Sequence, residues 1–583
     1  MPAASAALRP WSRTIHALTH LLAILSLFSL ALEYGFETPP IAIVWLHALQ
    51  IAAGVSYALW ISMQLVSAPA PERLRGRRLE AALVVAAAIA LALRCWLEPA
   101  ACLATLQVCM LLGIGIALLR IELPWARWSL APGRALASVF LTVILVGGTM
   151  LWALPTATAP ELSHQTRKYF AWHVLNCYFT ATGATCVTGL TIYDLETDFT
   201  LLGQIVILAM MQIGGVAMMT FGSIFGMRVA EAAAPFQVRR IVRGIIGITL
   251  LLEAIGAVLL CPMWPDSVGG PLMRAYYSVF HAVSAFCNAG FALNGNNLIP
   301  YARCWGVYAS IMPLIVLGGL GYPVLADLLA WARTRFRSRL SLHAQCVLLT
   351  TGVLVLGGAL LLFATESVDR RSSEERRQSD ARRDDSSTAW AGARLPHGER
   401  AAAALFQSVS ARSTGFRTVR LDAESFSSAG QLVLWSLMFI GGAPGSTAGG
   451  VKTVTVFAVV VAAVGALRGR RAVTAFGRTI PPDVLWRAGL VMLGMLGLMA
   501  LTALLLSLTE HAPLPQLIFE SVSAANSAGL STGLTPRLTV AGKIIIMLSM
   551  FSGRLGPLIL ALAATGGAAP ARGDYPEESV VIG

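Results

Sequence analysis

Four glycine-centred phrases recur in the sequence, and their backbone could coordinate a cation. The phrases are GATCVTGL (183–190), SAFCNAGF (284–291), SARSTGF (410–416) and SAANSAGL (523–530), and their central glycines are Gly189, Gly290, Gly415 and Gly529. Because glycine has no Cβ, the backbone around each can turn its carbonyl oxygens inward. Rings of carbonyls can replace the hydration shell of a cation. We therefore predict that the phrases form four walls of one ion-selective filter.

A second interpretation of the phrases is close helix packing, for which small residues are also suited. The position of the phrases favours the filter, because each lies between two apolar runs and follows a stretch too short to cross a membrane. These stretches are 169–183, 273–286, 401–411 and 514–525. As short helices they would point their partially negative C-terminal ends at the filter, which favours a cation over an anion.

The composition indicates an integral membrane protein. Of 583 residues, 56% are hydrophobic and 13% are charged, and the mean hydropathy is +0.69. A soluble domain cannot bury that much apolar surface. The net charge of +13 does not predict nucleic-acid binding, because the basic residues lie in short clusters between apolar runs. The nine cysteines include no C-x-x-C pair and predict neither a disulfide framework nor a zinc site.

Twelve apolar runs are long enough to cross a bilayer as helices, for which roughly 20 residues suffice. They are 19–35, 41–67, 79–97, 101–120, 134–155, 199–227, 241–262, 303–332, 342–364, 429–466, 485–508 and 539–566. Five arginine-rich clusters, near 73–78, 120–134, 239–243, 333–339 and 468–471, fall on one side of this arrangement. That side is expected to be the cytoplasm, together with both termini. The first run has no small-residue cleavage site after it, so we expect a membrane helix rather than a signal peptide.

One polar segment interrupts the apolar pattern. Residues 366–400 carry interleaved acidic and basic residues, as in DRRSSEERRQSDARRDD. Their low hydrophobicity predicts a flexible external loop, to which we assign no role.

The run 429–466 is interrupted by the glycine-rich stretch GGAPGSTAGGVKT (441–453). As one helix this run would be nearly twice as long as the bilayer core is thick, at about 1.5 Å per residue. The glycines and Pro444 would break it near mid-membrane, where a loop beneath the filter could act as a gate. A nucleotide-binding P-loop is the competing interpretation, but Val451 separates Gly450 from Lys452 and no strand precedes the stretch.

A few charged residues lie within apolar runs, where charge is costly and faces a bundle interior or a cavity. For Glu253 we favour a structural hydrogen-bonding role, whereas for Arg554 and Lys452 we favour a role in the ion path. Each cation would raise a barrier below the filter and could pair with carbonyls of the glycine loop. Arg412 is expected to brace the filter or the loop, and His343 is interpreted as a packing or interface residue.

These motifs together resemble the Trk/Ktr/HKT superfamily of potassium transporters, most of all the bacterial membrane subunits of Trk and Ktr systems. The phrases CVTGL, CNAGF, STGF and SAGLSTG carry the resemblance, with LMFIGGAPGSTAGGVKT and MFSGRLGPL. MMQIGGVAMMTF (210–221), LIVLGGLGYPVL (314–325) and RLSLHAQ (339–345) also match the family, in family order, over about residues 134–566. Ala217 stands where family members often carry glycine.

The resemblance implies an all-α integral membrane protein with four membrane–pore-loop–membrane repeats around one central pore. About four extra transmembrane helices (1–133) would precede them. The repeats would be 134–230, 231–338, 339–470 with the polar loop and the gate, and 471–567, followed by a cytoplasmic tail at 568–583.

The resemblance also implies which residues bind and gate the ion. The filter set is Cys186, Val187, Thr188, Gly189, Cys287, Asn288, Ala289, Gly290, Ser413, Thr414, Gly415, Ser527, Ala528 and Gly529. The gate set is Gly441, Gly442, Pro444, Gly445, Ser446, Thr447, Gly449, Gly450 and Lys452, opposed by Arg554. In the plant branch a serine at the first filter glycine goes with sodium preference. Gly189 is a glycine here, so the resemblance favours K⁺ as the transported ion, with no covalent cofactor.

The family further implies a homodimer in a bacterial inner membrane, controlled by a separate cytoplasmic nucleotide-binding subunit of the RCK type. The sequence leaves open a sodium-preferring or weakly selective cation pathway, and Na⁺ or H⁺ coupling. An enzyme would need a nucleophile–base pair, a metal cluster or paired carboxylates at membrane depth, and we find none in the sequence. A non-conducting scaffold would tolerate replacement of the filter glycines.

Overall fold

The computed structural model describes residues 132–153, 170–228, 235–335, 337, 339–377, 396–421, 426–470 and 473–563. All of them except Ala153 belong to the larger of two compact units of the chain. The four spans predicted before residue 121 and the predicted tail from residue 568 lie outside the described residues.

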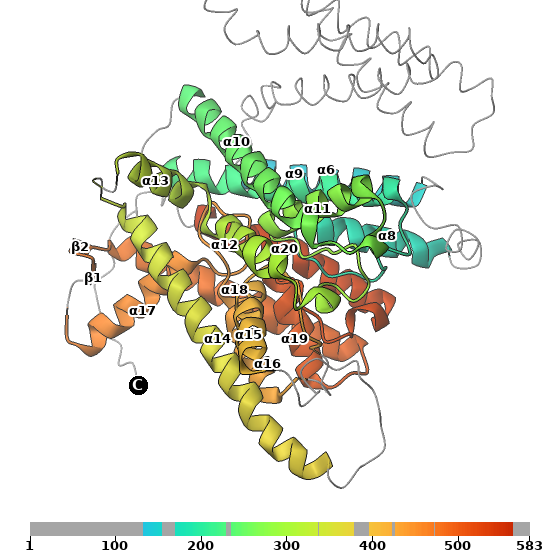
Figure 1. Cartoon of the computed structure of the whole chain (residues 1–583). Helices are drawn as coiled ribbons and strands as arrows, with labels where there is room; N and C mark the ends of the chain where they lie inside the picture. The colour runs from blue at the N-terminus through green and yellow to red at the C-terminus, as the bar shows by residue number, and fades with distance from the viewer. Residues whose placement is uncertain are drawn as a thin grey trace, which may run out of the picture. The chain divides into compact units, whose positions relative to one another are not determined.

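Six long helices run through the described part of this unit (Figure 1). They are α6 (Pro132–Ala153), α9 (Leu201–Arg228), α10 (Pro235–Leu260), α14 (Leu342–Arg377), α18 (Pro482–Thr509) and α20 (Val540–Ala563). Four segments among the described residues are long and apolar enough to span a bilayer: Leu201–Ile224, Val238–Met263, Leu342–Glu366 and Pro482–Thr509. Leu136–Trp152, on α6, is a shorter apolar helix.

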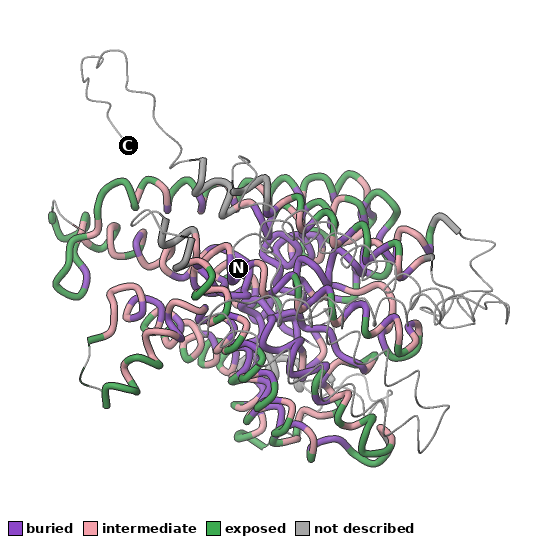
Figure 2. Tube along the Cα trace, turned by 90° about the horizontal axis from the view of Figure 1, so that it is seen from above, coloured by how far each residue is buried: buried purple, intermediate pink, exposed green. Residues whose placement is uncertain are grey.

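The outer faces of the long helices are apolar rather than polar. Val258 on α10, Leu360 on α14 and Leu493 on α18 are 73%, 69% and 71% exposed. Figure 2 shows buried residues gathered in the interior of the unit and exposed residues along the outer helices. Extended apolar surface of this kind marks a face that contacts lipid or another protein. The protein is an all-α integral membrane protein.

Four short helices pack against the long ones. They are α8 (Phe170–Thr185), α11 (Pro271–Phe286), α15 (His397–Ala411) and α19 (Leu514–Ala525). α8 packs on α9, α11 on α10, α15 on α14, and α19 on both α18 and α20. Each spans 12 to 16 residues, which at about 1.5 Å per residue is too short to cross a bilayer.

Two of the predicted spans are interrupted. The span predicted at 303–332 is a π-helical turn (Val307–Ile311), α12 (Met312–Leu320) and α13 (Tyr322–Arg333), bent by 104° at Gly321. The prediction of one continuous span is wrong there, because Gly321 takes a φ of +79° that ends α12. The run 429–466 forms α16 (Ser428–Phe439) and α17 (Thr453–Leu467), separated by residues 440–452.

Helices at both ends of the polar segment 366–400 leave a shorter loop than predicted. α14 continues to Arg377 and α15 begins at His397, while residues 378–395 lie outside the described residues. The sequence from 359 to 377 contains neither glycine nor proline, so nothing in it breaks the helix that starts in the apolar run.

The remaining described elements are small. They are the hairpin strands β1 (Thr474–Ala475) and β2 (Arg478–Thr479), and the 3₁₀ turns Cys261–Met263, Asp266–Val268, Ile299–Tyr301 and Thr535–Arg537. Phe476 and Gly477 both have positive φ, as a two-residue type I′ hairpin turn requires.

Candidate functional site

Each short helix ends four residues before one of the four central glycines. The φ angles of Gly189, Gly290, Gly415 and Gly529 are +83°, +71°, +87° and +77°. Only glycine adopts this region without a steric penalty. The repeated phrase therefore reflects one repeated backbone conformation.

The four glycines pack against one another in a closed ring. A Cβ placed on any of them would meet backbone of the following phrase, and the fourth phrase meets the first. The contacts join Gly189 to the Ala289 carbonyl, Gly290 to the Thr414 carbonyl, Gly415 to Gly529, and Gly529 to the Thr188 carbonyl. The four phrases, of which the first and last are about 340 residues apart in sequence, thus surround one common centre. A backbone carbonyl lies at each contact between neighbouring phrases.

Three of the short helices end in the same hydrogen-bonded turn. The N–H groups of Thr188, Ala289 and Ala528 donate to carbonyls five residues earlier, at 2.7, 2.7 and 2.9 Å. The residues before them are Val187, Asn288 and Ser527, which have φ between +51° and +60°. This is the Schellman arrangement, and a β-branched residue such as Val187 adopts it only under strain.

The third phrase differs from the other three. Thr414 N–H donates to the Ser410 carbonyl four residues earlier, at 2.9 Å, and Ser413 has no positive φ. The ring is therefore fourfold in its glycines but not in the turns that lead to them.

The structure brings all fourteen residues predicted for the filter together in this ring. Thirteen are buried and Gly189 is half-buried. We refer to residues 186–189, 287–290, 413–415 and 527–529 as the filter segments.

The loop 440–452 lies against the ends of the filter segments that follow directly on the short helices. The Thr447 hydroxyl donates to the Phe286 carbonyl at 2.9 Å, and Gly449 packs against the Asn526 carbonyl. A Cβ on Gly449 would overlap that carbonyl, which explains a glycine at this position. The predicted gate residues from Gly441 to Lys452 are all in this loop, and Arg554 reaches it from α20.

The bend between α12 and α13 holds the other side of the loop. Ala443 and Thr447 N–H groups donate to the carbonyls of Gly319 and Gly318 at 2.8 and 3.2 Å. The N–H of Tyr322, at the start of α13, donates to the Gly445 carbonyl at 3.1 Å. The broken helix thus supplies unpaired backbone groups that the loop satisfies.

Three basic side chains donate to carbonyls of the loop. Arg412 donates to Gly441 at 2.8 Å, Lys452 to Ala448 at 2.7 Å, and Arg554 to Thr447 at 2.6 Å. Arg554 is only 1% exposed. The pairing of Arg554 and Lys452 with loop carbonyls agrees with the sequence prediction, and Arg412 braces the loop rather than the opposite end of the filter.

Comparison with known proteins identifies the family. The family model for TrkH, described as a cation transport protein, matches residues 156–566. The chain belongs to the TrkH family. This is a family of membrane cation transporters and not of enzymes.

Curated relatives of this TrkH-family chain are similar over most of their length. The potassium/sodium uptake protein NtpJ of Enterococcus hirae is 32% identical over 78% of this chain and 98% of its own. The Ktr system potassium uptake protein B of Vibrio alginolyticus is 33% identical over 77% of this chain and 94% of its own. The solved potassium transporter TrkH of Vibrio parahaemolyticus shares the fold, with a TM-score of 0.56 and 17% identity, over 85% of this chain and 98% of that one.

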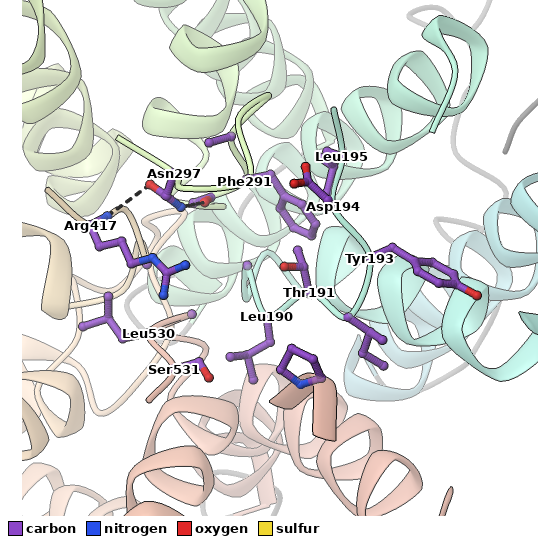
Figure 3. A pocket seen from close by; sticks show the side chains of 18 of the residues that line it. Leu190, Thr191, Tyr193, Asp194, Leu195, Phe291, Asn297, Arg417, Leu530 and Ser531 are labelled. Carbon is purple, nitrogen blue, oxygen red and sulfur yellow. Dashed lines mark hydrogen bonds between the residues drawn. The ribbon is translucent and has the colours of Figure 1, made fainter. Parts of the chain in front are cut away.

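A cavity of about 230 Å³ opens at the other end of the filter segments, beyond the glycines (Figure 3). We call it the vestibule. Asp194, Asn297 and Arg417 are among the side chains that line it. Burial raises the pKa of Tyr193, which also lines it, to about 12, so this phenol stays neutral. The vestibule of this TrkH-family protein thus combines one acidic and one basic side chain with neutral polar groups.

Asn297 joins the second filter segment to Arg417, two residues beyond the third, at the edge of the vestibule. Its side-chain amide donates to the Gly290 carbonyl at 3.3 Å and accepts from the Arg417 N–H at 3.1 Å (Figure 3). Asn297 has a φ of +57° in the stretch NGNN, a composition that signals a turn but not this contact. The sequence analysis missed both Asn297 and Arg417.

Two buried carboxyl groups lie behind filter segments. Glu253 Oε2 accepts from the Gln212 amide at 3.0 Å, and its Oε1 lies 3.8 Å from Cys287 Sγ, which agrees with the predicted hydrogen-bonding role. Glu520 accepts from the hydroxyls of Ser531 and Thr535, each at 2.6 Å, and was not predicted. His343 is half-buried in the first turn of α14, away from the ring.

Proposed function

We propose that this protein carries potassium ions across the membrane through the ring of filter segments. The closed ring of four glycines, with a backbone carbonyl at each junction, is the observation that supports this proposal. Four helix C-termini direct negative ends of their dipoles toward the ring, which favours a cation. Potassium is favoured because relatives over most of the chain are named potassium uptake proteins.

The loop 440–452 would act as the gate of this pore. It covers the ends of the filter segments nearest the short helices, and its carbonyls accept hydrogen bonds from the basic side chains of Arg412, Lys452 and Arg554. In the proposed orientation the vestibule faces outward, the loop faces the cytoplasm, and the membrane is a bacterial inner membrane with both termini inside. The boundaries of the four predicted repeats belong to the same proposal.

A homodimer regulated by a separate RCK-type cytoplasmic subunit is the proposed assembly. Three relatives are named as proteins of a Ktr system, a wording that fits a system of more than one component.

The alternative is a pathway that also carries sodium, or one that couples potassium to Na⁺ or H⁺. One relative is named a potassium/sodium uptake protein, a name that supports this alternative.

Rubidium uptake tests the proposal directly. The purified full chain in proteoliposomes, under a K⁺ diffusion potential, is expected to take up Rb⁺ in a manner blocked by external K⁺ but not by Na⁺. Equal block by both ions would support the alternative. If no uptake occurs, even after an RCK-type subunit is added, the proposal is wrong.

Replacing Arg417 with glutamine is expected to speed uptake at low ion concentrations. Removing a positive charge from the vestibule raises the local cation concentration, and we expect an increase of about two- to fivefold at low ionic strength. Salt screens such a charge over about 10 Å at 0.1 M, so the increase should shrink as an impermeant salt is added. Arg303→Gln, on an exposed side chain paired with Glu399, is the control. An Arg417→Gln rate equal to wild type at low salt would contradict the prediction.

A further inference from the structure

Asn288 connects two filter segments to the loop through its side chain. Its Oδ1 accepts from the Thr414 hydroxyl at 2.7 Å, and its Nδ2 donates to the Thr447 hydroxyl oxygen at 2.8 Å. Asn288 and Thr447 are each 1% exposed and Thr414 is fully buried. No solvent can replace these partners, so the three side chains depend on one another.

The hydrogen bonds run in one direction. Thr414 donates to Asn288, Asn288 donates to Thr447, and Thr447 donates to the Phe286 carbonyl at 2.9 Å. Because the Thr447 hydroxyl already donates to Phe286, it can only accept from Asn288, which fixes the orientation of the amide. Hydrogen bonds aligned in series polarise and strengthen one another in a low-dielectric interior.

Thr447 is also one of the residues through which the rest of the protein holds the loop. Its N–H donates to the Gly318 carbonyl at 3.2 Å, and its own carbonyl accepts from Arg554 at 2.6 Å. Any movement of the loop that displaces Thr447 therefore removes the 2.8 Å hydrogen bond of the Asn288 amide and leaves it the longer bond to the Phe286 carbonyl, at 3.4 Å. A buried amide that loses its shorter hydrogen bond is destabilised, so the filter segment that carries it would rearrange.

We propose that Asn288 is a positioning residue that makes the ion selectivity of the filter depend on the position of the loop. The proposal rests on the proposed function. With the loop in place, the hydrogen bonds of Asn288 hold the second and third filter segments at the spacing that favours K⁺. With Thr447 displaced, these segments lose that constraint and the preference for K⁺ over Na⁺ falls. Coupling between two sites is reciprocal, so changes at Thr414 should likewise affect the loop.

The selectivity of a loop variant is the test. The measured quantity is the ratio of Na⁺ to K⁺ concentrations that half-block Rb⁺ uptake by the full chain in proteoliposomes. Thr447→Val removes the hydroxyl at nearly constant shape and is expected to lower this ratio about tenfold, a typical consequence of losing buried hydrogen bonds. Thr447→Ser keeps the hydroxyl and is expected to stay within about twofold of wild type. Thr249→Val is the matched control, because it removes a buried hydroxyl on α10 that has no hydrogen-bond partner among the described residues.

A double variant separates coupling from two independent defects. Thr414→Val should lower the ratio in the same direction, and Thr414→Val/Thr447→Val should lose no more than the worse single variant, because both act through Asn288. Fully additive losses would overturn the proposal. So would a Thr447→Val protein with altered uptake rate but wild-type selectivity, since Thr447 would then affect the gate alone.

A readout without transport keeps this test distinct from the test of the proposed function. Ions that bind the folded protein raise its unfolding temperature. The K⁺ and Na⁺ concentrations that give the same rise in unfolding temperature can be compared for the protein in detergent. The Thr447→Val protein is expected to need about tenfold more K⁺ than wild type for the same rise in unfolding temperature, whereas the Na⁺ concentration it needs is unchanged. An unchanged K⁺ requirement would overturn the coupling even if wild-type uptake is normal. If Thr447→Val does not fold, Thr414→Val carries the same comparison.

Discussion

Replacing Gly290 with serine is expected to abolish potassium-selective uptake while the protein still inserts into the membrane. A Cβ at this position would overlap the Thr414 carbonyl oxygen and lie 2.8 Å from its carbon. The backbone also has a φ of +71°, which costs a non-glycine residue about 1–3 kcal/mol. Either the second or the third filter segment must move, and the ring of carbonyls opens. We expect the preference for K⁺ over Na⁺, measured by competition with Rb⁺ uptake, to fall at least about tenfold.

The matched control for Gly290→Ser is Gly477→Ser in the β1–β2 hairpin. Gly477 has nearly the same φ, +74°, but no atom of the described part of the chain lies within 4 Å of the position a Cβ would take. It therefore carries the backbone strain without the overlap. Wild-type selectivity in Gly290→Ser would show that the ring of glycines is not the filter. Equal losses in both variants would point to general destabilisation.

Hydropathy predicts most of the fold because lipid leaves a helix few alternatives to a continuous apolar surface. The helices α9, α10, α14 and α18 begin and end within three residues of the predicted spans, apart from the start of α10, which is six residues early, and the polar end of α14. The errors come from features that hydropathy does not register. Gly321 breaks a span with its positive φ, and the residues on both sides of it bond to a loop more than 120 residues away. α14 continues past Glu366 because the polar residues that follow the apolar run still favour a helix.

The candidate site, like the fold, could be predicted from the sequence only in part. The four glycines are visible in the sequence because a positive φ and a close approach both demand glycine, and the demand recurs four times. Contacts between side chains produce no such recurring pattern in the sequence. The bond from Asn288 to Thr447 joins residues 159 apart, and Arg412, within the third phrase, donates to the loop carbonyl of Gly441. An asparagine or an arginine at these positions fits many partners, so only the fold selects one.

Replacing Arg554 with methionine is expected to make the pore leaky. Arg554 is 1% exposed, and its guanidinium donates to the Thr447 carbonyl at 2.6 Å. A hydrogen bond from a charged group contributes about 1.5–3 kcal/mol, so its loss should shift the loop toward the open position by about 10- to 100-fold. Methionine retains much of the volume, and removal of the buried charge also lowers the electrostatic barrier to a cation beside the loop. The measurement is Rb⁺ uptake without any regulatory subunit.

Two further variants identify which property of Arg554 holds the gate. Arg554→Lys keeps the charge but not the planar fork, so a leak of intermediate size would indicate that hydrogen-bond geometry contributes beside charge. Arg487→Met on α18 removes an arginine whose ion pair with Asp483 is partly exposed and is worth about 0–1 kcal/mol. It should leave uptake unchanged. An Arg554→Met protein that folds and leaks no more than Arg487→Met would show that the loop is held by its backbone bonds to the α12–α13 bend, and that the cations beneath the filter do not gate it.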